Sequence, residues 1–169
     1  MKFLKNVVSN SSSYQAILDS IKHKNMPIAL TGLSLIHKSH IIYSLCTEQK
    51  RRAFVVAADE SEAQRMANDL QSMGLNSFIY PLRDFNFCDV DGKSREYEHK
   101  RLNVLLNIIN NKSDIIITCI DASLQYTIPK SILKEKTIVL KVSETIPAEK
   151  IINVLVSCGY ERYDQVEGE

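Results

Sequence analysis

The chain has 169 residues, of which 44% are hydrophobic and 24% charged, the composition of an ordinary globular domain. Its 21 basic and 20 acidic side chains leave a net charge of +1, which excludes a protein that binds nucleic acid through an overall basic surface. No apolar run approaches the roughly 20 residues that span a bilayer, and the N-terminus lacks the apolar stretch of a signal peptide. We therefore expect a cytoplasmic protein with no membrane partner.

The first half of the chain predicts helices alternating with strands. In chain order these are a helix over 11–25, a strand over 26–32, a helix over 36–49, a strand over 51–59 and a helix over 59–74. The last of these helices has the clearest signals. Asp59 is its predicted N-cap, Glu62 completes a capping box, and Gly74 marks its end.

The second half continues the same alternation. It predicts a strand over 76–82, a polar stretch over 83–93, a helix over 94–111, strands over 114–120 and 137–142, and a helix over 147–159. The strands are continuously apolar, as strands buried in a parallel sheet are. The pattern therefore predicts an α/β fold with a parallel sheet and helices on both faces. In the helix over 94–111, the pair Glu96 and Lys100 indicates a solvated, salt-bridged face.

Residues 32–39 resemble a phosphate-binding loop with one part changed. Gly32, Lys38 and Ser39 match the pattern of a glycine, four residues, then glycine, lysine and serine or threonine, but His37 stands at the second glycine. That glycine lets the backbone curl around phosphate oxygens without a Cβ in the way. Three interpretations remain open: a decayed site that keeps its shape, a working nucleotide site, and a coincidence of spacing. The first fits the sequence best.

A working site would also need an acidic residue for Mg²⁺. Asp59 with Glu60 follows one apolar strand, and Asp121 follows another. Each has a simpler explanation, because Asp59 caps the helix over 59–74 and Asp121 is the predicted N-cap of a short helix over 122–126. Two equally good imitations indicate that neither is specific.

No catalytic or metal-binding residue is predicted elsewhere. Residues 87–98 partly match a calcium-binding loop, but Phe87 stands where the first ligand is needed. His37 and His40 lie three residues apart and are better explained as part of a solvated helix start. The four cysteines are widely spaced, which predicts reduced thiols that mostly serve packing.

Three stretches together resemble the N-terminal region of bacterial transcription-repair coupling factors. They are "RDFNFCDVDGKSREYEHKRLNVLLNII" (83–109), "DIIITCIDASLQYTIP" (114–129) and "LVSCGYERYDQVEGE" (155–169). In that family this region is similar to the first domain of UvrB, the damage-verifying protein of nucleotide excision repair. The resemblance implies a RecA-like, P-loop NTPase-like sheet.

The resemblance also implies a division of the chain and a role for the altered loop. Residues 1–24 would be a helical lead-in, 25–158 a RecA-like domain of the UvrB type, and 159–169 the truncated start of a second, UvrA-binding domain. The module is a non-catalytic copy in this family, so Gly32, His37, Lys38 and Ser39 would be remnants that bind neither ATP nor Mg²⁺. The gap over 82–93 is too short for the DNA-clamping hairpin of UvrB.

For the whole protein, the resemblance implies an ATP-dependent DNA translocase that displaces RNA polymerase stalled at lesions. Its motor, with ATP and Mg²⁺, and its polymerase-binding and double-stranded-DNA-binding parts would lie beyond this chain, and UvrA would bind the following domain. This chain would scaffold that domain and take part in autoinhibitory contacts within the protein. Two alternatives remain: a P-loop ATPase or helicase domain that binds ATP itself, and a stand-alone flavodoxin-like binding module.

Overall fold

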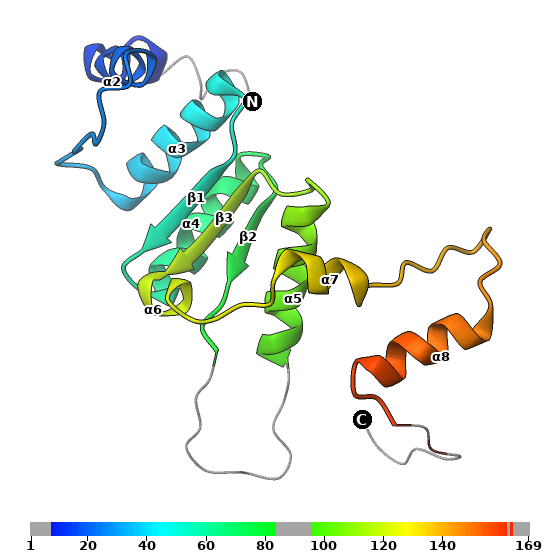
Figure 1. Cartoon of the computed structure of the whole chain (residues 1–169). Helices are drawn as coiled ribbons and strands as arrows, with labels where there is room; N and C mark the ends of the chain where they lie inside the picture. Colours follow the sequence, from blue (N-terminus) through cyan, green and yellow to red (C-terminus); the bar gives the residue numbers. More distant parts are fainter. Residues whose placement is uncertain (1–7, 84–95, 162, 164–169) are drawn as a thin grey trace. The chain divides into compact units, whose positions relative to one another are not determined.

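The computed structural model describes residues 8–83, 96–161 and 163 (Figure 1). The chain divides into two compact units, one that ends at Gln125 and one that starts at Tyr126. The sheet and the 32–39 segment belong to the first unit. In the parts that the structure describes, no helix is both long and apolar enough to cross a bilayer.

Helices precede, separate and follow the strands. The elements are α2 Ser12–Lys22, α3 Leu35–Gln49, β1 Ala53–Ala57, α4 Glu60–Ser72, β2 Ser77–Tyr80, α5 Glu96–Ile109, β3 Ile115–Cys119, α6 Ile120–Ser123, α7 Lys130–Glu135 and α8 Ala148–Ser157. The α4 boundaries follow the capping signals read from the sequence. Asp59 accepts a hydrogen bond from the Glu62 N–H at 2.7 Å, and Gly74, past the end of the helix, has a φ of 92°.

The sheet is parallel and three-stranded, with the order β1-β3-β2. The chain passes from β1 through α4 to β2 at the far edge, then returns through α5 to β3 in the centre. Parallel connections are right-handed, so crossovers in opposite directions place their helices on opposite faces. The predicted α/β class, with a parallel sheet between helices, is therefore confirmed (Figure 1).

The two faces of β3 have separate cores. Ile115 and Ile117 are fully buried in a cluster that includes Tyr43 of α3 and Leu70 of α4. Ile116 points to the other face, where it packs with Tyr80 of β2, Val104 of α5 and neighbouring apolar side chains. A strand with helices on both faces has no solvated side, which is why β3 reads as a continuous apolar run.

The edge strand β1 departs from that expectation. Its Phe54 and Val56 are 63% and 47% exposed, although Phe54 is the direct neighbour of the buried Ile116. Among the described residues, α5 covers β2 and β3 on this face and leaves β1 open (Figure 1). Continuous apolarity in the sequence therefore did not distinguish a central strand from an edge strand.

Two of the predicted strands are wrong. Residues 26–32 and 137–142 form neither helix nor strand. An apolar β-prone run becomes a strand only where a neighbour satisfies its N–H and C=O groups. Pro27 has no N–H to contribute to a ladder, which weakens the first of these runs further. The second lies in the unit that starts at Tyr126, where the described residues form no strand.

The second unit contains α7, which the sequence did not predict, and α8, which it did. Helix α8 follows Pro147, and Gly159 past its end has a φ of 89°, as the proline and glycine signals indicate. No residue of α8 is buried. The predicted start of a further domain at residue 159 stays a prediction, because the division at residue 126 concerns compact units and not domain identity.

Candidate functional site

The 32–39 segment leads into α3 beside the carboxyl end of β1. Gly32 has a φ of 75°, in the left-handed region that favours glycine. Ligands in parallel α/β folds bind outside the carboxyl ends of the strands, so this segment lies where a nucleotide site would lie.

Helix α3 begins at Leu35, so residues 35–38 of the pattern lie in its first turn. The N–H of Lys38 donates to the carbonyl of Ser34 at 3.0 Å, a hydrogen bond within that turn. The Nδ1 atom of His37 lies 3.1 Å from the Ser34 hydroxyl at the same helix start. A phosphate loop instead points its N–H groups at an anion.

The hydroxyl of Ser39 is also engaged inside the protein. Ser39 is fully buried, and its Oγ donates to Asp69 Oδ2 of α4 at 3.1 Å and lies 3.4 Å from the carbonyl of Leu35. In a working site this hydroxyl would bind Mg²⁺. Here it joins α3 to α4.

The ammonium group of Lys38 pairs with Glu62 of α4. The distance from Lys38 Nζ to Glu62 Oε1 is 2.9 Å, and Glu62 Oε2 accepts from the N–H of Ala58 at 3.0 Å. The hydrogen bond from Lys38, together with that from Ala58, lowers the pKa of the Glu62 carboxyl below its usual value. The Lys38 side chain is 44% exposed and that of Glu62 only 12%.

A hollow of about 520 Å³ opens beside this ion pair. Its lining is mostly aliphatic, with Lys38 and Glu62 as its charged groups, and includes Ile28, Leu30, Ile41 and Val56. An apolar wall does not solvate a triphosphate. The sequence named Gly32, Lys38 and Ser39 in this region but gave no signal for the contact from Lys38 to Glu62.

The acidic residues considered as metal ligands lie at the starts of helices α4 and α6. Asp59 caps α4, as predicted, and Glu60 lies in the first turn of that helix. Asp121 was expected to be an N-cap, but α6 starts one residue earlier, at Ile120, so Asp121 lies inside the helix. Within residues 8–83, 96–161 and 163, no three histidine, cysteine or acidic side chains gather as a metal site.

The remaining candidates are the calcium-like stretch and the cysteines, and part of them lies outside the described residues. Most of the calcium-like stretch over 87–98, and Cys88 within it, lies outside the described residues. Cys46 and Cys119 are buried free thiols, as packing cysteines should be, whereas Cys158 is free and exposed. Burial raises the pKa of the Cys46 thiol, which disfavours the reactive thiolate.

A second polar constellation, missed in the sequence, lies at the carboxyl end of β2. Arg101 of α5, the residue after the exposed Lys100, is only 6% exposed. Its Nη1 donates to the carbonyl of Pro81 at 2.7 Å and to Gln125 Oε1 at 2.8 Å, and its guanidinium lies 4.0 Å from the centre of the Tyr80 ring. Burial lowers the pKa of this guanidinium, although an arginine stays protonated in proteins.

Gln125, the last residue of the first unit, completes this constellation. Its Oε1 also accepts from the backbone N–H of Arg83 at 2.9 Å, and its Nε2 donates to the Arg83 carbonyl at 3.2 Å. One carboxamide thus holds the chain leaving β2 and the chain following α6. Among described residues no carboxylate pairs with Arg101, and its buried Nη2 makes no hydrogen bond.

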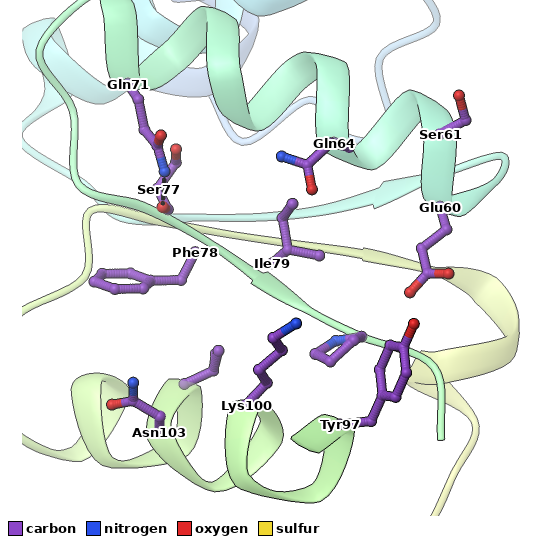
Figure 2. Close-up of a pocket in the computed structure, with 12 residues that line it drawn as sticks. Glu60, Ser61, Gln64, Gln71, Ser77, Phe78, Ile79, Tyr97, Lys100 and Asn103 are labelled. Atoms are coloured by element: carbon purple, nitrogen blue, oxygen red, sulfur yellow. Dashed lines mark hydrogen bonds between the residues drawn. The ribbon is translucent and has the colours of Figure 1, made fainter. Parts of the chain in front are cut away.

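A further hollow of about 590 Å³ lies along β2 between α4 and α5. Figure 2 shows Gln64 of α4 on one side of Ile79 and Lys100 and Tyr97 of α5 on the other. Lys100 pairs with Glu96 at 2.6 Å, as the sequence predicted. Its lining mixes polar side chains with the apolar Phe78, Ile79, Pro81 and Val104.

No protein-family model matches the chain, and no solved structure matches it significantly. Among curated proteins, the transcription-repair-coupling factor of Bacillus subtilis (strain 168) is 23% identical to it over 168 residues. The match covers 98% of this chain, and the chain spans 14% of the length of that relative. The resemblance predicted from the sequence motifs is therefore confirmed: over nearly all its length, the chain is similar to a transcription-repair coupling factor.

Proposed function

We propose that this chain is the N-terminal, UvrB-like module of a transcription-repair coupling factor and is catalytically silent by itself. The whole protein would be a cytoplasmic, ATP-dependent DNA translocase that displaces RNA polymerase stalled at lesions and recruits excision repair through UvrA. The module would scaffold the UvrA-binding domain that follows it and take part in autoinhibitory contacts.

Two observations support the assignment to this kind of protein. The match to the coupling factor extends over 98% of the chain rather than over one motif. The parallel sheet between helices, with a glycine-containing segment and a helix at the carboxyl end of a strand, agrees with a RecA-like ancestry. On this proposal residues 25–158 form the RecA-like domain, and the UvrA-binding domain begins near residue 159.

The observation that carries the silent role is the conformation of the 32–39 segment. The N–H of Lys38 is used within α3, its ammonium by Glu62, and the hydroxyl of Ser39 by Asp69. The lysine N–H, the lysine ammonium and the serine hydroxyl therefore each have a partner in the protein. Binding a nucleotide through these groups would require breaking these contacts.

Calorimetric titration with Mg-ATP, combined with thermal melts, tests the silent role. A nucleotide present at 100 times its dissociation constant would add about 2.7 kcal/mol of stability, so binding would raise the melting temperature. We expect no heat and no shift, for the wild type and for Lys38→Ala alike. Saturable binding that disappears in Lys38→Ala would support the ATPase alternative instead.

The scaffold role is tested in the intact coupling factor. Leu70→Asp places a charge in the core beside β3 and should disrupt this module. We expect the variant to lose capture of UvrA while it keeps ATP-driven translocation, and Lys38→Ala to keep both. Full UvrA capture by a variant whose module is shown to be unfolded would contradict the scaffold role.

A further inference from the structure

The environment of Glu62 has the composition of an anion-binding site. Its carboxylate receives the ammonium of Lys38 at 2.9 Å on one oxygen and the backbone N–H of Ala58 at 3.0 Å on the other. Ala58 directly follows β1, so both donors converge at the ligand edge of the sheet. A lysine and a backbone N–H are the donor types that proteins use to hold phosphate.

Helix capping explains only half of this arrangement. In a capping box, the side chain of the third helical residue accepts from the N–H of the N-cap residue, whereas Glu62 accepts from the N–H of Ala58, one residue before the cap Asp59. A glutamine accepts from such an N–H equally well. The contact to Lys38 joins α4 to another helix, α3, and needs the negative charge.

We propose that Glu62 is a built-in ligand: its carboxylate occupies a small-oxyanion site formed by Lys38 Nζ and the Ala58 N–H. When Glu62 is neutralised, the same two donors would bind a small oxyanion such as pyrophosphate in place of its side chain. This inference rests on the proposed silent function, because it names the group that keeps phosphate out. The substitution of His37 for glycine would then be one of two causes of that silence.

The surroundings restrict the ligand to a small anion that needs no metal. Ser39 donates to Asp69 and would not serve Mg²⁺, and the N–H of Lys38 is held in α3. The adjoining hollow of about 520 Å³ is lined mainly by aliphatic side chains. Two donors and an apolar wall suit a phosphate or pyrophosphate group rather than a complete Mg-nucleotide. The lowered pKa of the Glu62 carboxyl agrees with a carboxylate held by cationic and N–H donors.

The test is a titration of Glu62→Gln with sodium pyrophosphate, without Mg²⁺ and at constant ionic strength. Glutamine leaves the Asp59 cap on the backbone N–H of residue 62 in place and removes the charge, so pyrophosphate can displace the neutral side chain from Lys38 and from the Ala58 N–H. We expect a saturable rise in melting temperature and an apparent affinity on the order of two- to fivefold above that of the wild type, the strength of a partly exposed ion pair. Glu60→Gln is the matched control, since it removes a charge from the same helical turn.

The double variant Lys38→Met/Glu62→Gln decides whether Lys38 is the receptor. It should lose the response to pyrophosphate that Glu62→Gln gains. The proposal is overturned if Glu62→Gln responds no more than the wild type or Glu60→Gln, or if the double variant responds as strongly. Binding of Mg-ATP by the wild type would contradict the proposed silent function instead, so the two failures are distinct.

Discussion

The carboxyl ends of β1 and β2 each hold one cationic side chain, but the two cations differ in burial and in the kind of group that they contact. At β1, the cation Lys38 is paired with the carboxylate of Glu62, and 44% of the lysine side chain remains exposed. At β2, Arg101 is 6% exposed and bonds to neutral acceptors, the carbonyl of Pro81 and the amide of Gln125. Both cations lie at the edge where α/β proteins bind ligands.

The difference indicates which cation contributes more to the stability of the fold. A half-exposed ion pair is screened by water and contributes little to stability. A buried guanidinium is costly to desolvate, so its hydrogen bonds and stacking must be kept once it is buried. The contrast predicts that substitutions at β2 change folding strongly, and that substitutions at β1 mainly change which anions can bind.

The largest effect is expected for Arg101→Met. The side chain would lose its bonds to Pro81 and Gln125 and leave both acceptors without this donor. We expect the free energy of unfolding to fall by about 2–4 kcal/mol in urea titrations. Arg101→Lys, which keeps the charge but not the planar fork, should recover only part of the loss. A loss as small as that of Lys38→Met would remove the distinction between the two strand ends.

Ser39→Ala is expected to have an intermediate effect. The buried hydroxyl bonds to Asp69 across the contact between α3 and α4, so its removal should cost about 1 kcal/mol in the free energy of unfolding. Mg²⁺ should not change this cost. If the cost were absent without Mg²⁺ and appeared with it, Ser39 would be a metal ligand and not a structural residue.

A smaller effect concerns the pH dependence of the Lys38–Glu62 pair. Because the folded protein lowers the pKa of Glu62 below its ordinary value, the pair contributes stability above that ordinary value and loses it as the pH falls through the folded pKa. The wild type should therefore lose more stability than Glu62→Gln between pH 6 and acidic pH, by less than about 1 kcal/mol. Parallel urea titrations of the two proteins measure the difference, and equal losses would contradict it.

The smallest effect is expected at Lys100, which pairs with Glu96 on the surface of α5. Both side chains are more than half exposed, so Lys100→Met should leave the free energy of unfolding unchanged within error. The variant is therefore a control for Arg101→Met, one position further along the same helix. A large loss at Lys100 would mean that α5 as a whole tolerates substitution poorly.

Local signals in the sequence were reliable for features that depend on residues within a single element. Asp59, Gly74, Pro147 and Gly159 marked helix ends that the structure confirms, because capping depends on a few neighbouring residues. The burial of Arg101 could not be read in the same way. Arg101 directly follows the solvated Lys100 on α5, so its position in the sequence does not set it apart. Its partners Pro81 and Gln125 lie outside α5.

By itself, the sequence determined the α/β class, most helices, the central strand and the likeness to a coupling factor, since these depend on local propensity and on motifs within continuous stretches. Only the tertiary structure decided that residues 26–32 and 137–142 are not strands, because a strand exists only with a partner. It also decided that Lys38 and Ser39, which match the phosphate-loop pattern, are bound to Glu62 and Asp69. Those contacts join residues far apart in the chain, and no spacing rule predicts them.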